Sequence, residues 1–164
     1  KSNFLRLGLN SMQQYRIKFI LGKITAYVDA LRLGKTTVDD LTSYTQTAVE
    51  IEHIMPQTCA DKELYGMNDE DFSVYINRLG NLTLLENSIN KSIHNDVYAN
   101  KSKAYKQSKF YLTSSLSELV NQGHDTAINR TNSLLFAWSD WNKRSIEERQ
   151  EMLYRLSEMI WEMS

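Results

Sequence analysis

The sequence predicts an α+β domain that is mostly helical, with one strand–loop–strand–helix unit embedded in a helical scaffold. Near both ends of the chain, apolar residues recur three and four positions apart, which is the period of an amphipathic helix. Residues 48–53 alternate apolar and charged side chains, and residues 81–85 form a short apolar run, so both segments are predicted to be strands. No repeat or Pro/Gly-rich linker divides the 164 residues, and we expect a single domain over 1–164.

The first part of the chain, residues 1–35, is predicted to be helical scaffold. Between Met12 and Leu31 one face of a long helix is apolar, and the helix should end near Gly34. The residues of this face are Phe19, Ile20, Ile24, Tyr27, Val28 and Leu31. Residues 36–44 are rich in turn formers. The strand that follows is expected to be half-buried and to stop before Pro56.

The middle of the chain, residues 48–108, contains the strand–loop–strand–helix unit. A polar connection over 57–71 leads into a short helix from Asp69 to Leu79, and Gly80 turns the chain into the second strand. From Ser88 the pattern favours a helix, then a break near residues 95–96, then a second helical piece that ends at about Ser108.

The last part, residues 112–164, is predicted to consist of C-terminal helices. Residues 112–120 and 132–141 have helical patterns, and a polar break over 121–125 separates them. Ser145 and Glu148 have the spacing of a capping box, so the final helix should begin there. Its buried stripe is Met152, Leu153, Leu156, Met159 and Ile160.

Composition limits the cell compartment and the class of protein. The only cysteine, Cys59, cannot form an intrachain disulfide, and without a CxxC pair a zinc ribbon is excluded. No apolar run is long enough to span a bilayer, and no signal-peptide pattern opens the chain. We therefore expect a cytoplasmic location and no membrane partner. Because Lys1 stands where an initiator methionine would, we expect the C-terminal part of a longer protein.

The net charge of −1 does not by itself indicate a nucleic-acid binder, but one segment is basic. Between residues 91 and 109 only Asp96 opposes a run of cations. Read alone, such a run fits a solvated surface equally well. Because it directly follows the candidate site, we interpret it as a surface for the phosphate backbone and assign Lys101 to the scissile phosphate or its neighbour. The residues named for nucleic-acid binding are Lys91, His94, Lys101, Lys103 and Lys106.

The candidate site combines a base with oxygen ligands. His53 follows Glu52 at the end of the first strand, and an imidazole with a pKa near 6.5 is largely neutral at cellular pH and can accept a proton from water. Asn90, at the start of the helix after the second strand, offers a neutral oxygen. Glu52 and Asn90 form a sparse oxygen set that suits Mg²⁺. Asn81 is placed to brace the loop after His53, and Asn87 is a weaker rival for the ligand position.

These residues resemble a known family. Glu52-His53-Ile54-Met55-Pro56, then the segment 78–85 with Asn90, and Lys101 with Tyr105 and Ser108 resemble the HNH nucleases of the ββα-metal (His-Me finger) superfamily. More narrowly, they resemble the C-terminal domain of GmrSD-type modification-dependent restriction enzymes and related phage-defence proteins. The resemblance covers most of 12–112 and 145–161. Residues 121–140 do not match and are interpreted as an insertion.

The resemblance implies a fold, an activity and roles for the residues. The fold would be a ββα-metal (HNH) motif in a helical scaffold, and the three HNH letters would fall on His53, Asn81 and Asn90. Glu52 and Asn90 would hold Mg²⁺ or Mn²⁺, although many HNH proteins carry other residues at both positions. The activity would be metal-dependent nicking of phage or other foreign DNA in restriction or antiviral defence. A ParB-like nucleotide-hydrolysing or sensor domain would precede this one, and double-strand cleavage would need a homo-oligomer or a second event.

Two other functions fit the residues. A catalytically inactive HNH-fold module that binds nucleic acid or protein is the main alternative, favoured by the near-neutral charge and the sparse ligand set. A Glu-His pair is also common on ordinary surfaces, so a purely helical adaptor is the third interpretation. In such an adaptor Glu52, His53 and Asn90 would lie far apart.

Overall fold

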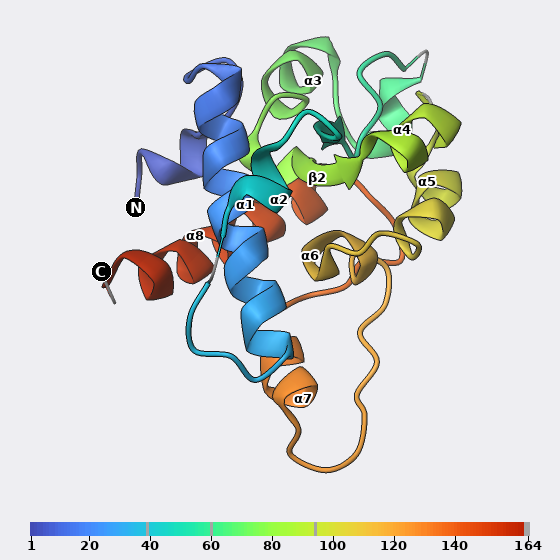
Figure 1. The fold of residues 1–164 in the computed structure, drawn as a ribbon. Coiled ribbons are helices and arrows are strands. Elements are labelled where there is room, and N and C mark those ends of the chain that lie inside the picture. Colours follow the sequence, from blue (N-terminus) through green and yellow to red (C-terminus); the bar gives the residue numbers. More distant parts are fainter. Residues whose placement is uncertain (39, 60, 94, 163–164) are drawn as a thin grey trace.

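Helices surround a two-stranded sheet in the computed structural model, which describes residues 1–38, 40–59, 61–93 and 95–162 (Figure 1). This arrangement confirms the predicted mostly helical α+β class and contradicts the purely helical adaptor. The strands are β1 (Val49–His53) and β2 (Leu82–Glu86). The α-helices are α1 (Gln14–Arg32), α2 (Thr42–Thr45), α3 (Asp69–Tyr75), α4 (Asn87–Ile93), α5 (Tyr98–Tyr105), α6 (Tyr111–Ser114), α7 (Ala127–Asn132) and α8 (Lys143–Glu162). The described residues also form three short 3-10 helices, η1 (Phe4–Arg6), η2 (Lys62–Tyr65) and η3 (Leu79–Asn81).

The sheet is an antiparallel pair whose long connection returns to the strand end that carries His53. His53 lies opposite Leu82, and Val49 lies opposite Glu86. Residues 54–81 connect the strands through η2, α3 and η3. The end of β1 and the start of β2 are therefore neighbours, which places Asn81 beside the residues that follow His53. The helices α4 and α5 come directly after β2 and lie on the right-hand side of Figure 1.

The long helix α1 supports the sheet with a buried face that agrees only in part with the expected one. Ile17, Leu21, Ile24 and Val28 are each 0% exposed and recur with helical spacing. Phe19, which we assigned to the buried stripe, is 45% exposed, so the buried face is rotated relative to the expectation. None of the helices in the described residues combines the length and the hydropathy that crossing a bilayer requires.

Two of the predicted C-terminal helices are wrong. Helix α6 ends at Ser114 rather than near Val120, and residues 133–142 form irregular structure instead of a helix. In the first segment the hydroxyl of Ser115 donates to the carbonyl of Tyr111 at 2.6 Å, a local bond that competes with helix continuation. In the second segment the backbone amide of Trp138 donates to the carbonyl of Leu116 at 2.8 Å, so tertiary contacts override the helical pattern.

Helix α8 begins two residues earlier than the capping-box prediction. Asn142, not Ser145, accepts from the first-turn amides, those of Arg144 at 2.9 Å and Ser145 at 3.2 Å. Glu148 is instead engaged by Arg144 and by the indole of Trp138. The predicted stripe is correct in its centre, because Met152, Leu153 and Leu156 are at most 2% exposed.

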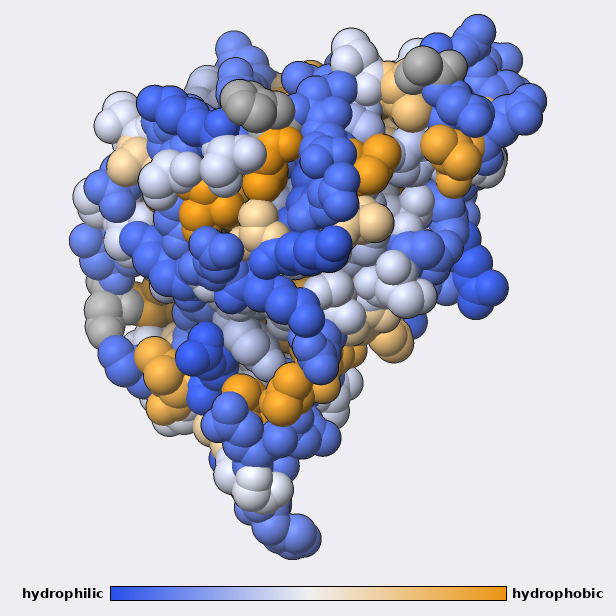
Figure 2. All heavy atoms as spheres, turned by 90° about the vertical axis from the view of Figure 1, so that its right-hand side faces the viewer, coloured by the Kyte–Doolittle hydropathy of each residue, from blue (hydrophilic) through white to orange (hydrophobic). Residues whose placement is uncertain are grey.

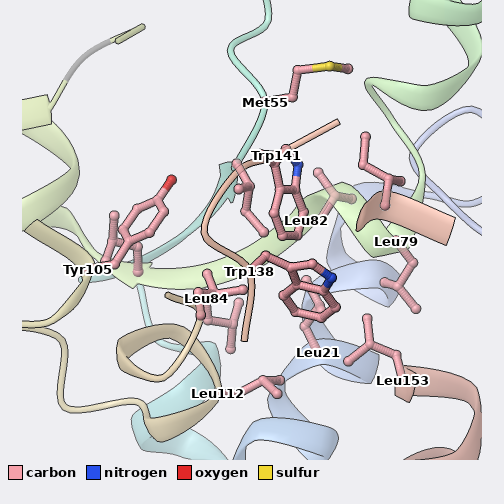
Figure 3. Packing of buried hydrophobic residues seen from close by; sticks show 14 of the residues in the cluster. Leu21, Met55, Leu79, Leu82, Leu84, Tyr105, Leu112, Trp138, Trp141 and Leu153 are labelled. Atoms are coloured by element: carbon pink, nitrogen blue, oxygen red, sulfur yellow. The ribbon is translucent and has the colours of Figure 1, made fainter. Parts of the chain in front are cut away.

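The core lies between the sheet, α1 and α8, and it is closed by two tryptophans from the irregular segment (Figure 3). The rings of Trp138 and Trp141 meet edge to face with centroids 5.3 Å apart. The close-up shows them between Leu82 and Leu84 of β2 on one side and Leu153 of α8 on the other. This packing ties the C-terminal segment to the strand next to the candidate site.

Candidate active site

Glu52 and His53 are both largely buried at the end of β1. Glu52 is 6% exposed and His53 is 9% exposed. In a regular strand neighbouring side chains point to opposite faces, so Glu52 shares its face with Glu50, while His53 shares the other face with Ile51. The strand stops at His53, and bends at Ile54 and Met55 follow. The bend therefore comes directly after His53, at the point where the chain leaves the sheet.

Glu52 is held by two residues of α5. The ammonium of Lys101 donates to Glu52 Oε1 at 2.6 Å, and the hydroxyl of Tyr105 donates to the same oxygen at 2.8 Å. Lys101 also donates to the backbone carbonyl of His53 at 2.8 Å. Lys101 is 2% exposed and Tyr105 is 1% exposed, so this is a buried ion pair with an added hydroxyl. Burial and the Glu52 carboxylate raise the pKa of Tyr105 well above its ordinary value, which keeps the hydroxyl protonated as a donor.

The imidazole of His53 contacts Asn77, which follows α3. Nε2 of His53 lies 3.3 Å from Oδ1 of Asn77, and Nδ2 of Asn77 donates to Oδ1 of Asn10 at 2.9 Å. Because the Asn77 nitrogen is occupied by Asn10, its oxygen faces the imidazole, and the network assigns the proton to Nε2. Burial lowers the pKa of His53, partly offset by Asn77 and Glu52. Burial thus favours the neutral form of the imidazole.

Asn81 fixes the loop after His53. Its Oδ1 accepts from the amide of Met55 at 2.8 Å and from the indole of Trp141 at 3.0 Å. Its Nδ2 donates to the carbonyl of Ile76 at 2.9 Å. The backbone carbonyl of Asn81 also accepts from the amide of Ile54 at 2.9 Å. The side chain is 0% exposed, so it acts on the loop that leaves the strand.

Helix α8 holds the turn that carries Asn81. Arg149 is 0% exposed, and its Nη1 donates to the carbonyls of Gly80 at 2.9 Å and Leu82 at 2.7 Å. The amide of Gly80 in turn donates to Oε1 of Gln150 at 2.5 Å. Burial lowers the pKa of Arg149 to about 9, and within the described residues Nε and Nη2 have no hydrogen-bond partner. The backbone of η3 therefore depends on two side chains some seventy residues away.

Asn90 lies on the helix face next to β1, but its side chain bonds to Glu50. Its Nδ2 donates to Oε2 of Glu50 at 2.6 Å. Glu50 points to the same face of β1 as Glu52. Residues of α4 and α5 contact this face. The structure thus places Asn90 over the strand face that carries the two glutamates. It does not place Asn90 in hydrogen-bond contact with Glu52 or His53 among the described residues. The Oδ1 atom of Asn87, the rival ligand, is buried and has no hydrogen-bond partner among the described residues.

Two side-chain oxygens on this face are the candidate ligands for a cation. The hydrogen bonds to Glu52 within the described residues all end on Oε1, which leaves Oε2 for a cation. The amide oxygen of Asn90 is likewise left free by the bond from its nitrogen to Glu50. No group of three or more His, Cys, Asp and Glu in the described residues could hold an ion by itself. A bound Mg²⁺ would therefore take most of its ligands from water and from a substrate phosphate.

The basic segment divides into exposed and buried lysines. Lys91 on α4, Lys103 on α5 and Lys106 directly after α5 are exposed, and Lys106 pairs with Glu118 at 2.8 Å. Lys101 is buried against Glu52, so its ammonium does not lie at the surface, where we expected it to contact the scissile phosphate. His94 lies outside the described residues. The side of the molecule that carries α4 and α5 is largely hydrophilic, with small separate apolar patches (Figure 2).

Comparison with protein families decides the family of the chain. Residues 1–156 match the family described as GmrSD restriction endonucleases, C-terminal domain. The chain belongs to this family. The match confirms the resemblance to the GmrSD C-terminal domain and spans residues 121–140, which we had interpreted as an insertion. No curated protein and no solved structure matches the chain. Membership of the GmrSD family indicates a restriction-endonuclease role and makes DNA the substrate class.

Sequence reasoning missed four residues that the structure brings to this GmrSD domain's site: Glu50, Asn77, Tyr105 as a partner of Glu52, and Arg149. Two signals were present. Lys101 and Tyr105 are four apart and therefore share one helix face. Arg149 falls three residues after Ile146 and three before Met152, so a cation stands within the apolar stripe of the last helix. Asn77 has no pattern that would distinguish it from an ordinary loop residue.

Proposed function

We propose that this domain is a metal-dependent DNA endonuclease of the HNH type that nicks one strand, with His53 as the general base. One observation supports the proposal most: at the end of β1 a largely buried histidine directly follows a glutamate whose carboxylate two buried donors hold in place. Family membership supplies the endonuclease class. The arrangement supplies the base and the oxygen ligands that phosphodiester hydrolysis needs.

His53 would accept the proton of the attacking water at Nδ1. Asn77 holds the proton on Nε2, so the lone pair of Nδ1 is the free acceptor. The loop over 54–55, fixed by Asn81, keeps the ring at the end of the strand. Asn77, Asn81 and Arg149 are positioning residues in this mechanism, because each acts through the backbone or ring of another residue.

Glu52 Oε2 and the amide oxygen of Asn90 would hold Mg²⁺ or Mn²⁺, with the Glu50 carboxylate on the same face of the strand. When bound, the ion supplies positive charge to the scissile phosphate and to the leaving 3′ oxygen. The exposed lysines, Lys91, Lys103 and Lys106, would contact the phosphate backbone on either side, and salt would weaken that contact. The biological role would be cleavage of phage or other foreign DNA, with selectivity in an N-terminal sensor domain and a homo-oligomer where both strands are cut.

Nicking of supercoiled plasmid tests the proposal against an inactive binding module. We expect relaxation with Mg²⁺ or Mn²⁺, none with EDTA, and loss of relaxation in both His53→Ala and Asn90→Ala. A gel-shift measurement on the same samples reports binding. If folded parent protein shifts DNA with or without cation but never nicks it, the binding module is the function instead.

The pH dependence of nicking should reflect the buried position of His53. Because burial lowers the pKa of His53, this base stays neutral to a lower pH than a free histidine does. A bound cation nearby would lower the pKa of His53 further. We expect the acid limb of the log(kcat) profile to lie below about 6.5, the ordinary histidine pKa. Asn77→Ala removes a contact that raises this pKa, so its acid limb should move further down. An acid limb above the ordinary value would contradict this assignment of the base.

A further inference from the structure

Lys101 occupies the position of a cation inside the candidate site. Its ammonium is 2% exposed and lies 2.6 Å from Glu52 Oε1 and 2.8 Å from the carbonyl of His53. Tyr105, one helical turn later on α5, donates to the same carboxylate oxygen. A single side chain thus contacts both residues proposed to carry the chemistry.

The geometry differs from that of an ordinary ion pair. The exposed pairs of this chain, such as Lys106 with Glu118, lie on the surface, where solvent screens them and they contribute little. The Lys101–Glu52 pair is shielded from water, so its charges interact strongly and removal of one partner leaves the other uncompensated. Both donors approach Oε1, so the carboxylate is oriented with Oε2 available.

We propose that Lys101 is an internal counter-cation of the metal-binding carboxylate. It holds Glu52 and the strand end in place before any divalent ion binds, and it limits the affinity of the site for that ion. The inference rests on the proposed role of Glu52 as a ligand. Its physical basis is like-charge repulsion: an ammonium on Oε1 and a divalent cation on Oε2 of one carboxylate repel each other at short range in a poorly screened environment. The result would be a weak site that substrate phosphate has to complete.

Lys101→Met removes the ammonium and keeps most of the side-chain volume. We expect Mn²⁺, measured by electron paramagnetic resonance without DNA, to bind roughly tenfold or more tightly to Lys101→Met than to the parent. Lys106→Met, on an exposed ion pair at the end of the same helix, should leave Mn²⁺ affinity unchanged. Glu52→Gln in each background identifies the ions bound at this site. Equal or weaker Mn²⁺ binding in Lys101→Met would overturn the proposal.

Thermal unfolding keeps the test decisive if Lys101→Met folds poorly without metal. In EDTA the variant should unfold at a lower temperature than the parent, because Glu52 is buried without a counter-charge. Mn²⁺ should raise its Tm by more than it raises that of the parent, since the ion replaces the missing ammonium. The double variant Lys101→Met, Glu52→Gln should recover stability in EDTA and lose the response to Mn²⁺. If Mn²⁺ raises the Tm of Lys101→Met by no more than it raises that of the parent, the inference is contradicted.

The plasmid assay separates this inference from the function on which it rests. If Glu52→Gln nicks as well as the parent, the metal-ligand role of Glu52 is wrong and the proposed function falls with it. If Glu52→Gln is inactive but Lys101→Met gains no Mn²⁺ affinity, the function stands and only the role of Lys101 is overturned.

Discussion

His53→Ala should reduce the nicking rate by about 10²- to 10⁴-fold, the range typical for loss of a general base. The ring contacts the substrate water in the proposed mechanism, and the structure provides no second imidazole nearby among the described residues. The protein should remain folded, because the ring makes a single side-chain hydrogen bond, to Asn77. Metal binding should persist, since Glu52 and its two donors are unchanged. Single-turnover nicking of plasmid measures the effect.

His124→Ala is the matched control for this variant. His124 is exposed in the loop before α7, so its removal changes histidine content without touching the site. We expect the control to nick at the parental rate. Unfolding curves for both variants report whether any loss reflects chemistry or stability. His53→Ala with parental activity would show that another group takes the proton.

Gly80→Ala should destabilise the domain by roughly 3 kcal/mol and lower Tm by about 10 °C. A Cβ at this position would lie 2.2 Å from the backbone carbonyl oxygen of Ile146 and 3.1 Å from the amide nitrogen of Gln150. Both are backbone atoms of α8, so neither can rotate away, and helix and turn would have to separate. Separation would stretch the bonds from Arg149 and Gln150 to η3 and shift Asn81. Nicking should therefore fall even under conditions where the variant is folded.

Gly22→Ala provides the comparison. Gly22 is inside α1, and an added Cβ would lie 3.2 Å from the methyl of Thr45, a side-chain atom that can move. The gain in helix propensity of about 1 kcal/mol offsets that contact, so the change in stability should stay within about 1 kcal/mol. Chemical denaturation of both variants measures the difference. Gly80→Ala with parental stability would mean that α8 does not pack directly on η3.

The centre of the fold could be predicted from sequence because its signals are local. The alternation over 48–53, stopped by Pro56, and the turn at Gly80 gave strands within one or two residues of β1 and β2. The break near Asn95 separates α4 from α5 as expected. Residues 133–142 could not be predicted in the same way, because the spacing of Trp138 and Trp141 resembles that of a helix. Their rings enter the core from an irregular chain, and partners distant in sequence, such as Leu116 and Asn81, determine that path.

Sequence patterns singled out part of the proposed site, but they missed Glu50, Asn77 and Arg149 and most of the contacts. Glu52, His53 and Asn81 were chosen from short motifs, and the structure brings them to one strand end. Lys101 was assigned to DNA because its basic segment directly follows the candidate site, and its burial is visible only when α5 is packed against β1. The partnership of Asn77 with Asn10 joins residues 67 positions apart, and that of Arg149 with Gly80 joins residues 69 apart. Contacts across such separations have no local sequence pattern.

The position of a bound cation tests the central claim most directly. Crystals of the His53→Ala variant soaked in Mn²⁺, measured at the manganese absorption edge, would locate the ion by its anomalous signal. We expect a peak within coordination distance of Glu52 Oε2 and the amide oxygen of Asn90, next to the position of the missing imidazole. The acidic loop over 61–71 lines a cavity with Asp61, Glu63, Asp69 and Asp71, where no ion is expected. A peak in that loop and none at Glu52 would contradict the proposed metal site and the mechanism built on it.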